Sequence, residues 1–409
     1  MMQMNADTTK ELKGGDRMES ENSRRWQGAL LLALLTWLLV AAAYRAAPAG
    51  QPGGTCIDFH FFYTAAQRLN HREPIYRLPV EGAYGYSPLL AELLRPLAQL
   101  PIDLAQRVWF AIETISMLLA AALYSRAVGL RLSSAVPIAI ILIVGVRTTM
   151  TTMEYFWGNS NLILVPLLCG AVLADSRGRL RAVAVLIALA ALIKVWMLGL
   201  VFYLALRRAW KEVGFAILAY ATSIVLLFSL VGWREFPTFI RIVSGVAGLA
   251  RMNTASSFPG FARFFLLGPD LLSHFIPYLA FILGGAVAVG GGLVYVARTI
   301  PEATPEQRRL HMNITMLSLL LMLPSCESFY YLLGLPALWE LLTGANQSPK
   351  RYPATVFVGA VLAYIVLSHH WSFLHERVPV EFLAGAGLWA LSLAALVASR
   401  RNAARGAAS

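Results

Sequence analysis

One acidic residue lies where a bundle of apolar helices would open toward water. Asp58 follows the first long apolar run by a few positions, within ThrCysIleAspPhe at 55–59. Burying a carboxylate beside apolar helices costs free energy unless the group is paired or used in chemistry. The sequence therefore makes Asp58 a candidate general base acting on a substrate dissolved in the membrane, with a structural ion pair as the alternative.

A second charged residue interrupts an apolar stretch. Lys194 lies between IleAlaLeuAlaAlaLeuIle and ValTrpMetLeu. A helix of about 14 residues rises only about 21 Å, less than the roughly 30 Å of a bilayer's hydrocarbon core. The ammonium group would then reach a lipid phosphate near the outer interface. The alternative is a lysine that snorkels from a helix end without any ligand.

Further candidates for a substrate site are polar and aromatic residues on the same predicted face. They are His60, Tyr63, Tyr86, Asn159, Asn161, Arg251, Arg263, Glu327 and Tyr330. The asparagines, in GlyAsnSerAsn at 158–161, could bind sugar hydroxyls or phosphate, whereas Asn159 or Ser160 could instead cap the next helix. The aromatic residues could equally form an interfacial belt, and the outer arginines could reflect a different topology.

The composition defines the class of protein that positions these residues. Of 409 residues 58% are hydrophobic and only 14% charged, where a soluble domain has about a quarter charged residues. This indicates a polytopic, all-α membrane protein. The net charge of +12 fits cytoplasmic loops and anionic lipid heads, and no basic module for nucleic acid is found. The cysteines and histidines lack metal-binding spacing, so no metal site is predicted, although a Cys56–Cys326 disulfide stays open.

Apolar runs of spanning length predict about twelve segments that cross or enter the membrane. The single runs are 27–47, 107–124, 133–148, 161–175, 213–231, 271–297, 310–325, 329–343, 353–368 and 380–398. The stretch 180–208 has basic clusters on both sides, which predicts a hairpin of two short helices with Lys194 near its tip. The distribution of Lys and Arg places both termini in the cytoplasm.

Four parts of the chain follow from this topology. Residues 1–26 are expected to be a disordered cytoplasmic tail, 27–399 a single transmembrane domain, and 400–409 a second cytoplasmic tail. The first extracytoplasmic loop, 48–106, holds Asp58. Helical spacing at 61–69 and Pro88 at the start of 87–97 predict two short interfacial helices in this loop.

Several motifs, in this order, resemble glycosyltransferase family 87, the polyprenyl-phosphate-mannose-dependent mannosyltransferases. The motifs are AspPhe at 58–59, TyrThrAlaAlaGlnArgLeu at 63–69, TyrGlyTyrSerPro at 84–88, ProLeuAlaGlnLeuPro at 96–101 with Trp109, GlyAsnSerAsn at 158–161 and AlaLeuIleLys before ValTrp at 191–196. The resemblance covers roughly residues 27 to 345. The chain departs from the family at 324–331, where ProSerCysGluSerPheTyrTyr replaces a Ser-Pro and Trp-x-His pattern, and Glu327 is a candidate to replace part of that chemistry.

The resemblance implies a GT-C fold and an active site on the extracytoplasmic side of the plasma membrane. The expected reaction passes a hexose, mannose first of all, from a polyprenyl phosphate to a lipid-linked or glycan hydroxyl, with inversion. Asp58 would be the base and Lys194 would contact the donor phosphate. No cofactor is expected beyond the lipid-phosphate sugar itself, while a divalent metal, the oligomeric state, the acceptor and the linkage stay open.

Two other classes compete with this interpretation. A transporter or flippase would also place charged residues in a polytopic bundle, but it predicts internal repeats and ionisable groups near the midplane. Neither is seen in the sequence. Another extracytoplasmic enzyme acting on lipid-linked glycans, such as a ligase, is the second alternative.

Overall fold

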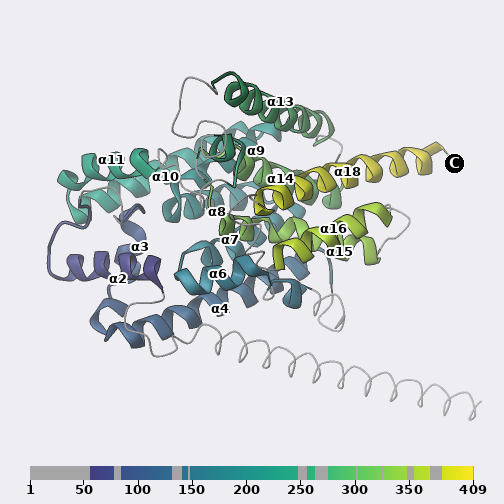
Figure 1. Ribbon diagram of the computed structural model, residues 1–409. Helices are drawn as coiled ribbons and strands as arrows, with labels where there is room; N and C mark the ends of the chain where they lie inside the picture. The colour runs from purple at the N-terminus through teal and green to yellow at the C-terminus, as the bar shows by residue number, and fades with distance from the viewer. Residues whose placement is uncertain are drawn as a thin grey trace, which may run out of the picture.

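The protein is described by a computed structural model over residues 56–77, 84–130, 141–145, 148–246, 256–262, 275–300, 303–324, 326–347, 354–368 and 380–408. These residues form helices joined by short connections, as the sequence predicts (Figure 1). The predicted N-terminal tail and the predicted span 27–47 lie outside the described residues. Arg251 and Arg263 also lie outside them.

Four helices of the described residues are long and apolar enough to cross a membrane. They are α4 (Ile102–Ala127), α10 (Trp210–Val231), α13 (Phe275–Thr299) and α18 (Val380–Ala408). Shorter apolar helices include α7 (Asn161–Ser176), α8 (Leu180–Ile193) and α16 (Ala354–Ser368). Each lies on a predicted apolar run, while the count of about twelve segments stays a prediction. Helix α18 continues to Ala408, through residues expected to form a tail.

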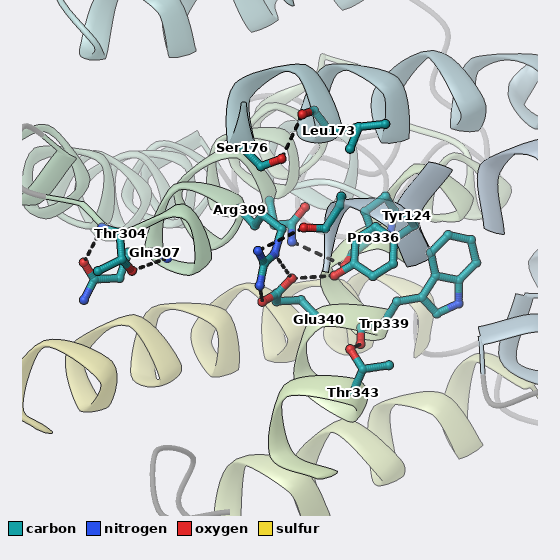
Figure 2. Close-up of polar contacts among 12 residues, drawn as sticks. Tyr124, Leu173, Ser176, Thr304, Gln307, Arg309, Pro336, Trp339, Glu340 and Thr343 are labelled. Atoms are coloured by element: carbon teal, nitrogen blue, oxygen red, sulfur yellow. Dashed lines mark hydrogen bonds and ion pairs between the residues drawn. The ribbon is translucent and has the colours of Figure 1, made fainter. Parts of the chain in front are cut away.

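The centre of the bundle contains a helix that is polar in sequence. Helix α14 (Pro305–Met322) begins with a capping box between Thr304 and Gln307, and most of its residues are buried. It packs against α18 and α7, and α15 (Leu335–Gln347) lies beside it (Figure 1). One of its polar residues, Arg309, makes two hydrogen bonds, of 2.7 and 3.0 Å, to the Glu340 carboxylate (Figure 2).

The chain breaks at Lys194, which confirms the break predicted in 180–208. Helix α8 ends at Ile193, Lys194 has an extended backbone, and the 3₁₀ helix η2 (Val195–Leu200) leads into α9 (Val201–Leu206). Both short helices contact α8, so the segment turns back on itself before Arg207. Helix α10 then runs along α8 (Figure 1).

The first loop forms two helices close to the predicted positions. Helix α2 (Ile57–Asn70) begins four residues earlier than expected, and α3 (Pro88–Leu93) has Pro88 in its first turn. A 3₁₀ turn, η1 (Leu97–Gln99), leads into α4. These elements share an aromatic core with Phe228 of α10 and Phe239 of α11 (Phe236–Val246). The loop is therefore a packed part of the structure.

Two hydrogen bonds tie this loop to the membrane helices. The backbone N–H of Tyr76 donates to Glu235 Oε2 over 3.1 Å, in the 3₁₀ turn η3 (Trp233–Glu235) between α10 and α11. The Ser87 hydroxyl donates to the Leu192 carbonyl, which lies in the last turn of α8. A carbonyl in that turn has no partner within its own helix, so Ser87 satisfies the end of α8.

Candidate active site

The site begins where α2 meets the end of α6 (Thr149–Trp157). The Cys56 N–H donates to the Phe156 carbonyl over 2.7 Å, just before α2 starts. Gly158 ends α6 with φ +65°, and a Cβ there would lie 2.8 Å from the Phe59 Cβ. Only glycine allows this backbone conformation and this contact without strain. The approach places Asp58 beside the turn between α6 and α7.

Asp58 is paired with Asn159 of that turn. The Asn159 amide donates to the Asp58 carboxylate, and its Oδ1 accepts hydrogen bonds from Ser160 N at 2.6 Å and from the Tyr86 hydroxyl at 3.4 Å. Burial raises the pKa of Asp58 above its ordinary value, while the Asn159 hydrogen bond and the charge of Lys194 act in the opposite direction. A carboxylate with a raised pKa that still ionises is suited to proton removal.

Glu154 caps helix α7 in place of the residues that the sequence suggested. Ser160 is at the N-cap position, but its side chain makes no capping hydrogen bond. The Glu154 carboxylate instead accepts from the Asn161 N–H, from the Asn161 side-chain amide at 2.9 Å and from the Leu162 N–H at 3.2 Å. Burial raises the pKa of Glu154, and these hydrogen bonds and Lys194 favour its ionised form.

Lys194 extends its ammonium into the same region. Its side chain is 4% exposed, and Nζ has no hydrogen-bond partner among the described residues. The carboxylates of Glu154, Glu327 and Asp58 all lie close enough to attract it. Nζ lies 4.0 Å from the centre of the Tyr330 ring, a cation–π distance. A buried ammonium without a hydrogen-bond acceptor is prepared to bind an anionic group.

Two aromatic groups enclose the ammonium. Tyr86 comes from the first loop, with its ring centre 5.7 Å from Lys194 Nζ, and packs edge-on against Phe62 of α2. Tyr330 comes from the 3₁₀ helix η7 (Ser328–Gly334) and stacks on Trp196, with 5.5 Å between ring centres. Residues from widely separated parts of the chain therefore converge on Lys194 and Asp58.

Two other predicted site residues, His60 and Tyr63, lie away from this group. His60 is exposed. It follows Asp58 by two residues, which corresponds to about 200° of rotation along a helix, so the two side chains point to different sides of α2. Tyr63 is buried, and its hydroxyl donates to the Leu100 carbonyl over 2.6 Å, which holds α2 to η1. Arg251 and Arg263 fall outside the described residues. The site thus brings together Asp58, Tyr86, Asn159, Asn161, Lys194, Glu327 and Tyr330.

The sequence assigned no role in the site to Glu154 or Trp109. Glu154 appears in the sequence only as one acid among several polar residues near the outer face, and its capping bonds arise from the fold of the α6–α7 turn. Trp109 donates from Nε1 to the Gly158 carbonyl over 3.1 Å and is 2% exposed. A tryptophan in the first turns of α4 gives no sequence signal for this contact.

The cysteines and the possible metal ligands were predicted to have no metal-binding spacing, with one disulfide left open. All three cysteines, Cys56, Cys169 and Cys326, are free thiols, so the Cys56–Cys326 disulfide is not formed. Among the described residues, no group of three His, Cys, Asp or Glu side chains is arranged to hold a metal ion.

The chemistry that this arrangement offers is group transfer at a membrane. A buried carboxylate can remove a proton, and a nearby ammonium can neutralise a departing anion. Apolar helices surround both groups. A membrane-embedded transferase whose substrate carries an anionic leaving group would use both groups in this way.

Comparison with known proteins identifies the family. The model of glycosyltransferase family 87 matches residues 84–324, more than half of the chain, and the protein belongs to this family. The match includes Tyr86, Asn159, Asn161 and Lys194, whereas Asp58 precedes it and Glu327 follows it. The helical bundle formed by the described part of the chain agrees with the GT-C architecture expected for the family.

Comparison with curated proteins found no match. Among solved structures, the chain is similar to ArnT from Cupriavidus metallidurans bound to undecaprenyl phosphate. The TM-score is 0.39 and the sequence identity 13%, over 90% of this chain and 76% of ArnT.

Proposed function

We propose that this glycosyltransferase passes a hexose, mannose first of all, from a polyprenyl phosphate to a hydroxyl of a lipid-linked or glycan acceptor. The observation that carries the proposal is a buried Lys194 whose ammonium has no hydrogen-bond acceptor among the described residues and lies close enough to Asp58 for the two charges to interact. Family membership supports sugar transfer, and the resemblance of the site motifs to the mannosyltransferases supports the donor.

The proposed reaction is a single displacement. Asp58 takes the proton of the acceptor hydroxyl, and the acceptor oxygen forms a bond to the anomeric carbon. The bond from this carbon to the phosphate oxygen breaks, and the polyprenyl phosphate departs with the bonding electrons. One in-line displacement inverts the anomeric centre. Lys194 neutralises the charge that develops on the phosphate, and the protein contributes mainly positioning and electrostatics.

Glu154 and Glu327 have a supporting role in this proposal. Each contributes a carboxylate that attracts the Lys194 ammonium. The hydrogen bonds of Glu154 at the start of α7 fix the position of its carboxylate. The negative charge that attracts the ammonium therefore stays in one position. Tyr86 and Tyr330 would then line the space beside the departing phosphate.

The decisive experiment compares three purified proteins in liposomes: wild type, Asp58→Asn and Asp103→Asn. Asp103 is an exposed acid in the first turn of α4 and is the matched control. Each is incubated with radiolabelled polyprenyl-phosphate-mannose and a glycolipid extract. We expect Asp58→Asn to lower the transfer rate at least about a hundredfold, the lower range for loss of a general base, and Asp103→Asn to leave it unchanged. Equal rates in all three proteins would overturn the role of Asp58.

The donor and the class of protein are tested by the wild type in the same assay. Transfer from a glucose donor or another hexose donor, without transfer from the mannose donor, would show that the donor sugar is not mannose. Movement of the labelled lipid between leaflets, without any sugar transfer, would indicate that the protein acts as a transporter.

The proposed location is the plasma membrane, with an extracytoplasmic site and cytoplasmic termini. His60→Cys lies on an exposed position of α2, and Lys211→Cys lies on an exposed position of α10. In intact cells an impermeant maleimide should label the first variant and leave the second unlabelled. The reverse pattern would place the site in the cytoplasm.

A further inference from the structure

Asn159 has almost no free hydrogen-bonding capacity for a substrate. Asn159 is only 2% exposed, and its Oδ1 already accepts hydrogen bonds from Ser160 N and from the Tyr86 hydroxyl. An amide oxygen has two lone pairs, so both are used. One N–H of the amide donates to Asp58, which leaves a single N–H.

These contacts determine which way the amide points. The Ser160 N–H, 2.6 Å away, must face the amide oxygen, because two N–H groups cannot share a hydrogen bond. The NH₂ end is therefore directed at the Asp58 carboxylate. The hydrogen bond from Tyr86 selects the same orientation from the side of the first loop.

The backbone that carries Asn159 is fixed in turn. Trp109 of α4 donates to the Gly158 carbonyl over 3.1 Å, and the left-handed conformation of Gly158 directs the chain from α6 toward α7. The Asn159 N–H donates to the Glu154 carbonyl over 3.3 Å. A chain of contacts thus runs from the buried ring of Trp109 through Gly158 and Asn159 to Asp58.

We propose that Asn159 is a positioning residue, which holds the Asp58 carboxylate in one orientation for proton removal and does not bind the sugar. This rests on the proposed role of Asp58 as the base. It changes the function that the sequence suggested for Asn159, a ligand of sugar hydroxyls or phosphate.

The charged and titratable groups around Asp58 define what a pH measurement reports. Lys194 faces it from the end of α8, Tyr86 from the first loop and Tyr330 from η7, while Glu154 and Glu327 face the same ammonium. Of these, Asn159 and Lys194 favour the ionised carboxylate. Removing the Asn159 amide therefore moves the ionisation of Asp58 to higher pH.

The first measurement is the kinetics of Asn159→Ala, with Asn313→Ala as the matched control. Asn313 is a buried asparagine of α14 whose amide donates to the Pro336 carbonyl over 3.3 Å, away from the site. Misplacement of a reacting group by about 1 Å can cost about a hundredfold in rate. We expect Asn159→Ala to lower kcat by about 10- to 100-fold, with the KM of both substrates unchanged and the acid limb of the rate moved to higher pH. Asn313→Ala should change none of these.

The second measurement needs no knowledge of the donor. Dicyclohexylcarbodiimide reacts with protonated carboxyl groups in apolar surroundings, so labelling of Asp58 at a series of pH values, read by mass spectrometry, follows its ionisation. In Asn159→Ala the midpoint of labelling should lie at higher pH than in wild type and in Asn313→Ala. If wild type transfers no sugar from any donor, the proposed function fails while this titration still tests the contact.

Two results would overturn the proposal. One is a raised KM with kcat unchanged in Asn159→Ala, which would make Asn159 a substrate ligand. The other is an unchanged labelling midpoint. If Asn159→Ala does not fold, as judged by size-exclusion chromatography, Trp109→Phe replaces it. This variant keeps the aromatic packing and removes the hydrogen bond to Gly158, and we expect a smaller fall in kcat at unchanged KM; a full wild-type kcat would count against the proposal.

Discussion

The Nζ atom of Lys194 lies 4.0 Å from the centre of the Tyr330 ring, and this ring in turn stacks on Trp196. The ammonium is thus held by an aromatic face while its three protons keep no acceptor among the described residues. A cation–π contact of this kind contributes about 2 kcal/mol when desolvated. The ammonium can keep this contact and still donate hydrogen bonds to a phosphate.

Replacing Lys194 by glutamine is expected to weaken donor use. Loss of a charge-assisted hydrogen bond of roughly 1.5–3 kcal/mol corresponds to a fall of about 10- to 100-fold in kcat/KM for the donor. Lys194 also lowers the pKa of Asp58, so its removal raises that pKa. If Asp58 is the base, as proposed, it acts in its ionised form. As the pH is lowered, the variant should then lose activity at a higher pH than wild type does. Steady-state rates across a pH series test both effects.

Lys211→Gln provides the control for this variant, since Lys211 is an exposed lysine in the first turn of α10. It should behave as wild type. A wild-type kcat/KM in the Lys194→Gln enzyme would show that Lys194 does not contact the donor.

Gly158 and Gly129 form a natural pair for testing the contact between α2 and α6. Both have left-handed backbones, with φ +65° and +74°, but a Cβ on Gly129 would meet nothing within 4 Å. Gly129→Ala should therefore cost only about 1–2 kcal/mol for the backbone conformation. Gly158→Ala should cost more, because its Cβ would lie 2.8 Å from the Phe59 Cβ. Thermal unfolding in detergent measures the difference, and equal losses of stability would show that the contact can relax.

The buried pair Arg309–Glu340 is expected to be essential for stability. Its side chains are 12% and 1% exposed, and Tyr124 donates to the same carboxylate over 2.6 Å (Figure 2). Breaking a buried ion pair from one side costs about 3–5 kcal/mol, since it leaves an uncompensated charge. We expect this loss for Glu340→Gln. Glu73→Gln, which breaks an exposed pair with Arg77, should cost at most about 1 kcal/mol. A comparable loss in both variants would contradict the prediction.

Cys56 should resist alkylation although it is partly exposed. Burial raises the pKa of its thiol to about 11, with the charge of Glu113 acting in the same direction. Since the thiolate is the reacting form, N-ethylmaleimide near neutral pH should label Cys56 slowly in the native protein and fully after denaturation. Mass spectrometry of the labelled peptides gives the rates. Fast native labelling, or a Cys56 disulfide in the purified protein, would refute this expectation.

The local elements of the site could be read from the sequence. Pro88 marks the start of α3, helical spacing marks α2, and a lysine between two short apolar halves marks the end of α8. Each of these signals acts within a few residues. The low content of charged residues also identifies the chain as a membrane protein.

The pairings between distant residues could not be read in this way. His60 was grouped with Asp58 because the predicted topology places both on the outer face. Helix α2 begins at Ile57 and includes both residues, which directs the two side chains to different sides. The capping of α7 by Glu154 depends on the left-handed turn at Gly158, which brings an acid seven residues upstream back to the helix start. Such contacts depend on tertiary packing, which the periodicity of a sequence does not encode.

The hydrogen bond from Ser87 to the Leu192 carbonyl has a consequence for the evolution of the enzyme. It joins the loop that holds Asp58, the proposed base, to the end of α8, two residues before Lys194. Neither segment can change its length or position without leaving a buried carbonyl unpaired. We therefore expect substitutions in one segment to require matching changes in the other. A chimera that takes its first loop from one relative and its lysine hairpin from another would assemble the correct residues in an incorrect geometry.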